Sequence, residues 1–152
     1  MRAVIQRVKN AWLTVNGGEK QEMGAGLVVL FGVKEGDDPK DTLAVAQKIA
    51  QLRIFEDSEG KMNISALDLG LDCMVVSQFT LFADTKKGRR PSFVKAAKPD
   101  VAIPIYEKFL SEIHAAGFNK VVHGEFGADM QINLTNDGPV TIIIDTDEWR
   151  NS

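Results

Sequence analysis

The sequence predicts a single α/β domain, and three features of the chain lead to that class. Apolar residues make up 44% of the 152 residues, which suits one compact domain with a real core. Short segments of alternating or β-branched apolar residues predict strands. Two longer segments carry apolar residues at helical spacing and predict helices. We therefore expect one domain over residues 1–152.

The N-terminal part of the chain predicts three strands. Ala3–Val8 and Trp12–Val15 read as a strand pair, with Lys9-Asn10-Ala11 near the turn between them. Asn16-Gly17-Gly18 is a second, strong turn signal. The continuous apolar run Leu27–Val33 predicts a central strand that is buried on both faces.

Two amphipathic helices are expected between the strands. Asp38 can cap a helix that begins at Pro39 and runs to about Gln51. The second helix is expected from Asp100 or Val101 to Ala116, before the natural C-terminal cap Gly117. The apolar stripes consist of Leu43, Ala46, Ile49 and Ala50 in the first helix and Ile105, Phe109, Ile113 and Ala116 in the second.

A long strand over Asp72–Phe82 is expected to carry Ser77-Gln78-Phe79-Thr80-Leu81. Alternation would place Ser77 and Phe79 on one face of it, and Gln78 and Thr80 on the other. Burying such polar groups unpaired costs about 1–3 kcal/mol each. They therefore either bond to neighbouring backbone or line a cleft, and both readings stay open.

Charge is unevenly distributed along the chain. The net charge is -3 and the pI about 5.4, which argues against a protein that coats long nucleic acid. The loop Thr85–Pro99 is nevertheless strongly basic. A charge run is usually a solvated surface, but this contrast favours a loop that contacts phosphate. Its basic residues are Lys86, Lys87, Arg89, Arg90, Lys95 and Lys98.

The segment Asn136–Thr141 separates two apolar runs, Met130–Leu134 and Val140–Ile144, which predict two strands. Gly138-Pro139 therefore lies at or near a strand-to-strand turn. An ordinary turn is the simplest interpretation. A Gly-Pro pair also has a second option, because the bond before proline can be cis and glycine lets backbone approach a ligand closely.

The usual catalytic and metal motifs are not recognised in the sequence. His114 and His123 have no metal-binding spacing to each other or to Cys73, and no phosphate-binding glycine loop or Gly-x-Ser-x-Gly elbow occurs. A triad of Ser77 or Thr80 with one of the histidines stays open, although a solvated helical role suits His114 better. Any catalysis would then depend on positioning, backbone electrostatics or groups of the substrate.

The cysteine count, the N-terminal segment and the lengths of the apolar runs also indicate where in the cell the protein is expected. Cys73 is the only cysteine, lies in an apolar run and is expected to be a buried hydrophobe. The charged N-terminus is unlike a signal peptide, and no apolar run approaches the 18 residues of a membrane span. We expect a cytoplasmic protein with no membrane contact.

Two stretches together resemble the paired signature motifs of the D-aminoacyl-tRNA deacylases, also called D-tyrosyl-tRNA deacylases. They are Ser77–Leu81 and Asn136–Thr141. The resemblance covers nearly the whole chain. Weaker parts of it are Met1–Val8, Leu52–Phe55, Lys87–Phe93 and Phe126–Met130.

This resemblance implies an α/β fold of layered β-sheets with helices packed on one side. It also implies a homodimer whose active site lies at the dimer interface, with no metal or organic cofactor. Gly138 and Pro139, joined by a cis bond, would form a chiral gate that enters the partner's pocket. Ser77, Gln78, Phe79 and Thr80 would line the pocket for the aminoacyl group and terminal adenosine. Met130 would border the pocket, and Arg7 would brace the Gly-Pro loop.

The activity implied by the resemblance is hydrolysis of the ester of D-aminoacyl-tRNA, with rejection of the L form during translation. A steric gate of this kind also predicts hydrolysis of glycyl-tRNA, because glycine has hydrogen at both Cα positions. Backbone N–H groups near Phe79 and Thr80 would stabilise the oxyanion, and the ribose 2′-OH would help activate water. Thr80 as a covalent nucleophile is the rival mechanism. The rival functions are a side-chain-driven esterase for other acyl esters and a non-catalytic RNA-binding module that uses Lys86–Arg90.

Overall fold

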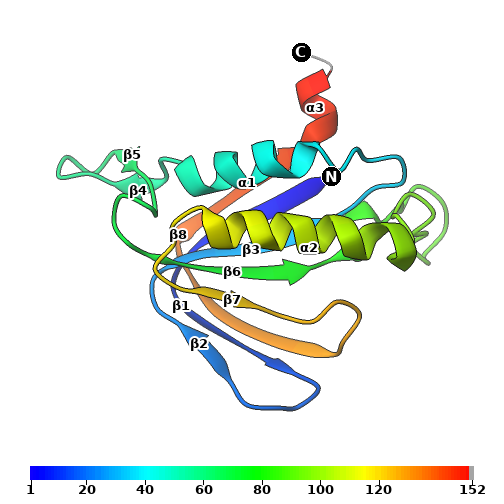
Figure 1. Ribbon diagram of the computed structural model, residues 1–152, viewed down its shortest axis with the longest axis horizontal. Coiled ribbons are helices and arrows are strands. Elements are labelled where there is room, and N and C mark those ends of the chain that lie inside the picture. Colours follow the sequence, from blue (N-terminus) through cyan, green and yellow to red (C-terminus); the bar gives the residue numbers. More distant parts are fainter. Residues whose placement is uncertain (151–152) are drawn as a thin grey trace.

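The computed structural model describes residues 1–150, which form a mixed α/β structure (Figure 1). The α/β class is therefore confirmed. The elements in chain order are β1 (Arg2–Val15), β2 (Gln21–Met23), β3 (Gly26–Gly32), α1 (Asp41–Gln51), β4 (Phe55–Glu56), β5 (Met62–Ile64), β6 (Asp72–Ser77), the 3₁₀ turn η1 (Phe79–Phe82), α2 (Pro99–Ala115), β7 (Val121–His123), β8 (Met130–Asp145) and α3 (Thr146–Arg150).

A six-stranded sheet organises this part of the chain. Strand β1 pairs antiparallel with β8 along one edge, and with β3 and β2 along the other. Strands β3, β6 and β7 continue the sheet in parallel, while β4 and β5 form a separate hairpin. Helices α1 and α2 lie side by side over one face of the sheet (Figure 1). Within residues 1–150 no helical segment has the length and apolar character needed to span a bilayer.

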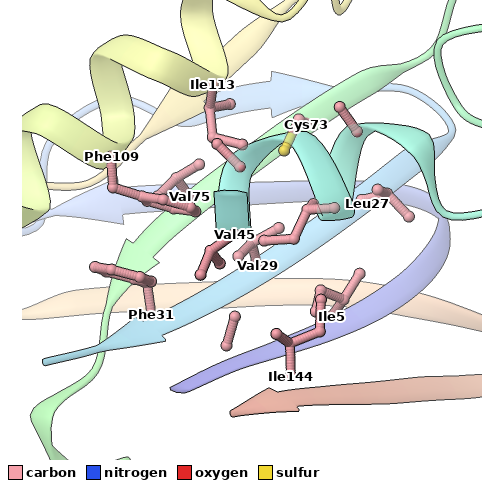
Figure 2. Packing of buried hydrophobic residues seen from close by; sticks show 14 of the residues in the cluster. Ile5, Leu27, Val29, Phe31, Val45, Cys73, Val75, Phe109, Ile113 and Ile144 are labelled. Carbon is pink, nitrogen blue, oxygen red and sulfur yellow. The ribbon is translucent and has the colours of Figure 1, made fainter. Parts of the chain in front are cut away.

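Strand β3 is buried on both faces, as its apolar run predicts. Leu27, Val29 and Phe31 point into the cluster between the sheet and the two helices (Figure 2). Val28 points the other way, into a second cluster formed by residues of β1, β2, β6 and β7. The Phe31 ring stacks on Phe109 of α2 with 4.0 Å between centroids, which fixes the helix against the sheet. Two apolar layers on opposite faces of one sheet thus hold β3 and β6 rigidly in place.

The prediction of a turn at Lys9-Asn10-Ala11 is wrong. Strand β1 runs unbroken from Arg2 to Val15. Its register against β8 shifts between Gln6 and Val8 and again between Val8 and Asn10. An irregularity of this kind absorbs a polar pair on the strand surface without reversing the chain.

The turn expected at Gly138-Pro139 is also wrong, because β8 is one strand of 16 residues. The Gly138–Pro139 peptide bond is cis, as the resemblance implies, and it lies within this strand opposite the irregular part of β1. The side chain of Asn136 spans the cis bond: its Oδ1 accepts from the Val140 N–H at 2.7 Å, and its Nδ2 donates to the Val140 carbonyl at 3.2 Å. Further along β8, Ile143 is 62% exposed.

Strand β6 ends at Ser77, earlier than predicted. The chain then turns through η1, with the Leu81 N–H donating to the Gln78 carbonyl at 3.2 Å. The expected alternation of Ser77 and Phe79 with Gln78 and Thr80 is therefore wrong, because it applies only to an extended strand. Gly32 permits this turn to pack closely, since a Cβ there would lie 2.9 Å from the Gln78 carbonyl oxygen.

The predicted helices are present with small differences. Helix α1 begins at Asp41, not Pro39, because the Asp38 carboxylate accepts from the Lys40 N–H in a turn before the helix. Leu43 was expected in its buried stripe but is 47% exposed, and Val45 is buried instead. Helix α2 agrees within two residues. Cys73 is buried as expected, and burial raises the pKa of its thiol.

Candidate active site

A cavity of about 620 Å³ opens where β6 ends. Its size is typical of a site for a small ligand. Four parts of the chain converge on it: the end of β6 with the start of η1, the loop that leads into α2, the turn between β7 and β8, and the beginning of β8. The lining residues are Val76–Phe79, Phe93, Ala96–Pro99, Phe126–Met130 and Ile132.

The β6–η1 junction supplies the polar part of the cavity. Ser77 and Gln78 are half-buried there, and the Gln78 N–H donates to the Phe31 carbonyl at 2.8 Å, which anchors the junction to β3. The N–H groups of Phe79 and Thr80 follow at the start of a helical turn. Amides in that position have no acceptor within the turn, so they can bind a ligand atom.

Thr80 is placed differently from the three residues before it. Its side chain is exposed and does not line the cavity, and its hydroxyl accepts a hydrogen bond from the Gln78 amide nitrogen. The structure thus gives Thr80 a contact that orients Gln78. Phe79 is 52% exposed and packs edge-on against Phe93, with 5.2 Å between ring centroids. Two aromatic rings therefore flank one side of the opening.

Met130 borders the cavity from the first position of β8. Its thioether occupies space that only a glycine at position 124 leaves free, because a Cβ on Gly124 would lie 2.1 Å from the Met130 sulfur. Position 124 thereby controls where this flexible side chain sits, and with it the shape of the cavity wall.

The Gly138–Pro139 segment forms a separate group with Arg7. Arg7 is only 6% exposed, and its Nε donates to the Asp137 carbonyl at 2.8 Å while Nη1 donates to the Ile54 carbonyl at 2.8 Å. Gly138 has φ +141°, and a Cβ there would lie 2.8 Å from a Val140 methyl group and 3.2 Å from the Arg7 guanidinium. Backbone and arginine are thus fitted closely together, while Gly138 and Pro139 themselves are exposed.

Within this chain these two groups of residues do not meet. Ser77, Gln78, Phe79 and Met130 line the cavity, whereas Thr80, Arg7, Gly138 and Pro139 do not. Two arginines of β1 indicate how far η1 lies from the Gly-Pro segment. Arg2 donates to the Leu81 carbonyl in η1, and Arg7, five residues further along, binds the Gly-Pro segment. Five residues of extended strand span roughly 16 Å.

Sequence reasoning did not assign several residues of the cavity wall. Phe93, Ala96, Ala97 and Ile132 had no role, and Lys98 was recognised only as part of the basic loop. The available signal was the position of that loop directly before Pro99, where α2 begins and its first turn faces the cavity. The histidine pair of α2 and β7 lies outside the cavity, with 6.0 Å between the ring centroids of His114 and His123.

Comparison with known proteins gives a consistent family. The model of the family described as D-Tyr-tRNA(Tyr) deacylase matches residues 4–145. A D-aminoacyl-tRNA deacylase of Parabacteroides distasonis is 53% identical over 146 residues, which covers 96% of this chain and 97% of the relative. One from Thermus aquaticus is 53% identical over 148 residues and covers 97% of both chains.

Two solved structures are similar in fold. The one titled c-Myc DNA Unwinding Element Binding Protein superimposes with a TM-score of 0.87 at 39% identity, over 95% of this chain and 98% of the other. A probable eukaryotic D-amino acid tRNA deacylase superimposes with a TM-score of 0.81 at 19% identity, also over 95% and 98%. At that lower identity the likeness concerns the fold alone.

Proposed function

The chain belongs to the D-Tyr-tRNA(Tyr) deacylase family, and from this premise we propose that it is a hydrolase of the ester that joins a D-amino acid to the 3′ end of tRNA. The products are free D-amino acid and tRNA. The proposed biological role is chiral proofreading in the cytoplasm, where aminoacyl-tRNA is used for translation. The observation that carries the proposal is about 50% identity, over nearly the whole chain, to relatives named D-aminoacyl-tRNA deacylase.

The geometry of the β6–η1 junction supports a mechanism based on backbone electrostatics. The N–H groups of Phe79 and Thr80 stabilise the oxyanion that forms when water attacks the ester carbonyl. Loss of one such donor costs about 3–4 kcal/mol in related chemistry. The ribose 2′-OH of the tRNA helps to activate the water. Ser77 and Gln78 hold the aminoacyl end, and the exposed ring of Phe79 contacts the terminal adenosine.

The Gly138–Pro139 segment acts as the chiral gate in this proposal. Its carbonyl groups accept hydrogen bonds from the substrate ammonium, which fixes the Cα relative to the ester carbon. A D side chain then points away from the segment, whereas an L side chain would enter its backbone. Exclusion by a rigid wall rejects a wrong ligand more strongly than a loosely fitting pocket does. The bonds from Arg7 and Asn136 supply that rigidity.

A gate of this kind admits glycine. Glycine has hydrogen at both Cα positions, so no side chain clashes with the backbone of the Gly138–Pro139 segment. Glycyl-tRNA is therefore hydrolysed as well. Complete resistance of glycyl-tRNA to an enzyme that is active on a D-aminoacyl-tRNA contradicts a purely steric gate.

The proposal includes a homodimer, and the separation of the Gly138–Pro139 segment from the cavity within one chain supports it. The Gly138–Pro139 segment is exposed and does not line the cavity of its own chain, so in this proposal a second copy provides it. Mixing two inactive variants tests this arrangement. Co-expressed Gln78→Ala and Gly138→Trp chains regain activity in the mixed dimer, where one intact cavity meets one intact gate. If gate and cavity act in the same chain, the mixture stays inactive.

The decisive assay follows ester loss from D-tyrosyl-tRNA and L-tyrosyl-tRNA in parallel. Loss of the D form alone supports the proposed function. Loss of both forms identifies a general esterase. Binding of tRNA without ester loss identifies an RNA-binding module, and either of those results overturns the proposal.

A further inference from the structure

The segment of residues 85–98, called here the basic loop, holds an unusual share of the positive charge. Six of the 18 basic residues of the chain fall in it, although the chain as a whole carries -3. No acidic residue interrupts the loop. The rest of the chain is correspondingly acidic, so this loop is the place where a polyanion meets attraction instead of repulsion.

The base of the loop is held firmly beside the cavity. Asp84 and Ser92 exchange two backbone hydrogen bonds of 2.7 and 2.9 Å, which closes the loop. Further along, the Glu35 N–H donates to the Lys95 carbonyl at 2.9 Å and the Ala97 N–H donates to the Val33 carbonyl at 3.0 Å. The tip, residues 85–91, projects from this base with Gly88 in a left-handed conformation. The loop therefore presents its tip to solvent at a defined position.

The cations at the tip are not neutralised within the protein. Across residues 1–150, Lys87, Arg89 and Arg90 are exposed and have no carboxylate within salt-bridge distance. Lys95 differs, because it pairs with Asp84 at 3.6 Å and so contributes to the base of the loop. Cations that have no partner of their own are available to an external anion.

The loop and the cavity are continuous. Phe93 and Lys98 belong to the loop and also line the cavity, and Phe93 contacts the exposed ring of Phe79. Phe79 is exposed and Phe93 is half-buried, and aromatic rings that a base can reach beside unpaired cations are the combination that binds single-stranded nucleic acid, in which bases stack and phosphates pair. A protein surface that only keeps the chain soluble needs neither the rings nor the cavity.

We propose that the basic loop, through Lys87, Arg89 and Arg90, binds the backbone phosphates of the tRNA acceptor end on the 5′ side of the terminal nucleotide. The inference rests on the proposed function, since it assumes that the ester occupies the cavity. With the terminal adenosine beside Phe79, the strand leaves the cavity past Phe93, where the cations meet its phosphates. The loop thus contributes to affinity for tRNA and not to the chemical step.

The test compares two substrates that share the D-tyrosyl ester and the terminal adenosine, of which only one continues into the nucleotides and phosphates of the acceptor end. One is D-tyrosyl-tRNA, and the other is the 3′-D-tyrosyl ester of adenosine, which has no phosphate. The triple variant Lys87→Gln, Arg89→Gln, Arg90→Gln is compared with a control that removes equal charge at exposed positions elsewhere, Lys40→Gln, Lys48→Gln, Lys61→Gln. Binding of uncharged tRNA is measured for all three proteins over a range of salt concentrations.

The loop variant is expected to lose at least about tenfold in kcat/KM on the tRNA substrate and to keep kcat/KM on the adenosine ester within about twofold. Its tRNA affinity is expected to depend less on salt, with the slope of log K against log salt smaller by about 2–3. The control variant behaves like the unmodified protein. Unchanged activity on tRNA, or equal loss on both substrates, overturns the proposal.

The two proposals fail in distinguishable ways. If the unmodified protein hydrolyses neither ester, the proposed function is wrong. The salt dependence of binding to uncharged tRNA still decides on the basic loop in that case, because it needs no hydrolysis. Equal slopes for the loop variant and the unmodified protein would then overturn the phosphate contacts.

Discussion

Arg7 donates a hydrogen bond of 2.8 Å to the main-chain carbonyl oxygen of Asp137, the residue directly before Gly138. The same guanidinium donates to the Ile54 carbonyl at 2.8 Å. A side chain that is 6% exposed thus ties the Gly-Pro segment of β8 to the chain between α1 and β4. The planar fork of arginine suits this double contact, and a lysine ammonium does not reproduce it.

Arg7→Lys is therefore expected to loosen the Gly-Pro segment. One of the two carbonyls loses its donor, which costs about 1–3 kcal/mol in unfolding free energy. The proposed gate predicts that the preference for D-tyrosyl-tRNA over L-tyrosyl-tRNA falls roughly tenfold or more, because a gate displaced by about an ångström would no longer exclude the L side chain. Urea unfolding and paired hydrolysis rates measure the two effects. Arg53→Lys, at an exposed arginine before β4 that donates to the Asn63 carbonyl, is the control and should change neither by a comparable amount.

Gly138→Ala probes the backbone of the same segment. The added methyl group would lie 2.8 Å from a Val140 methyl group at φ +141°, so the segment must move. Hydrolysis of D-tyrosyl-tRNA is expected to drop by about tenfold or more. Gly60→Ala is the control, since Gly60 also has positive φ (+77°) but faces open space. Equal activity of the two variants would show that the exact position of the segment is unimportant.

Sequence patterns predicted the elements whose surroundings are uniform. The apolar run at β3 and the helical spacing of Ile105, Phe109 and Ile113 describe environments that repeat along the element, so a local pattern is sufficient. The sequence patterns gave wrong predictions where the pairing of one strand with another decides the path of the chain. Lys9 and Asn10 look like a turn, but β8 pairs along the whole of β1 and keeps the strand extended.

The residues of the candidate site also divide into those that a local sequence pattern predicts and those that depend on distant parts of the chain. Polar residues at the end of β6 were recognised from the sequence, and the resemblance added Met130, which the structure brings to the same cavity. The separation of that cavity from Gly138 depends on which strands are neighbours and in which register, and no local pattern contains that information. The contribution of Phe93 and Lys98 depends on how a loop folds back, which is equally non-local.

Thr80→Ala separates the two mechanisms for ester hydrolysis. The Thr80 hydroxyl contacts Gln78 and does not line the cavity, so its removal is expected to reduce kcat by no more than about tenfold. A nucleophile would cost far more, and its ester could be trapped. Steady-state rates and intact-protein mass spectrometry after mixing with substrate are the measurements. A mass increase at Thr80 equal to one aminoacyl group contradicts the backbone mechanism.

Gly124→Ala tests how the cavity is shaped. A Cβ at position 124 would lie 2.1 Å from the Met130 sulfur, so the thioether must leave its position at the cavity wall. Since methionine is flexible, stability should change by less than about 1.5 kcal/mol. The ratio of kcat/KM for D-tyrosyl-tRNA to that for D-alanyl-tRNA should change by about threefold or more, because the larger tyrosyl side chain of the substrate contacts the altered cavity wall. The double variant Gly124→Ala, Met130→Ala removes the clash and should bring the ratio closer to that of Met130→Ala alone.

The pH dependence of the unfolding free energy, through Tyr106 of α2, tests the packing behind the cavity. It is 4% exposed, its hydroxyl has no hydrogen-bond partner within residues 1–150, and burial raises its pKa to about 12. The unfolded chain has a tyrosine pKa of about 10. Unfolding therefore becomes more favourable between pH 10 and 12, where the unfolded chain releases a proton that the folded chain retains. The stability is fully present below pH 10 and declines by roughly 2–3 kcal/mol as pH approaches 12.

Because Tyr106 is the only tyrosine of the chain, tyrosinate absorbance near 295 nm reports this side chain alone. The folded protein is expected to titrate with a midpoint near pH 12, and the urea-unfolded protein near pH 10. Tyr106→Phe is the matched variant: it removes the unpartnered hydroxyl, so it should be as stable as the unmodified protein at pH 7 and more stable at pH 11. Circular dichroism on the same samples verifies that the fold persists. A midpoint near pH 10 in protein that is still folded would mean that water reaches the Tyr106 hydroxyl and that the helix–sheet packing around it is looser than described.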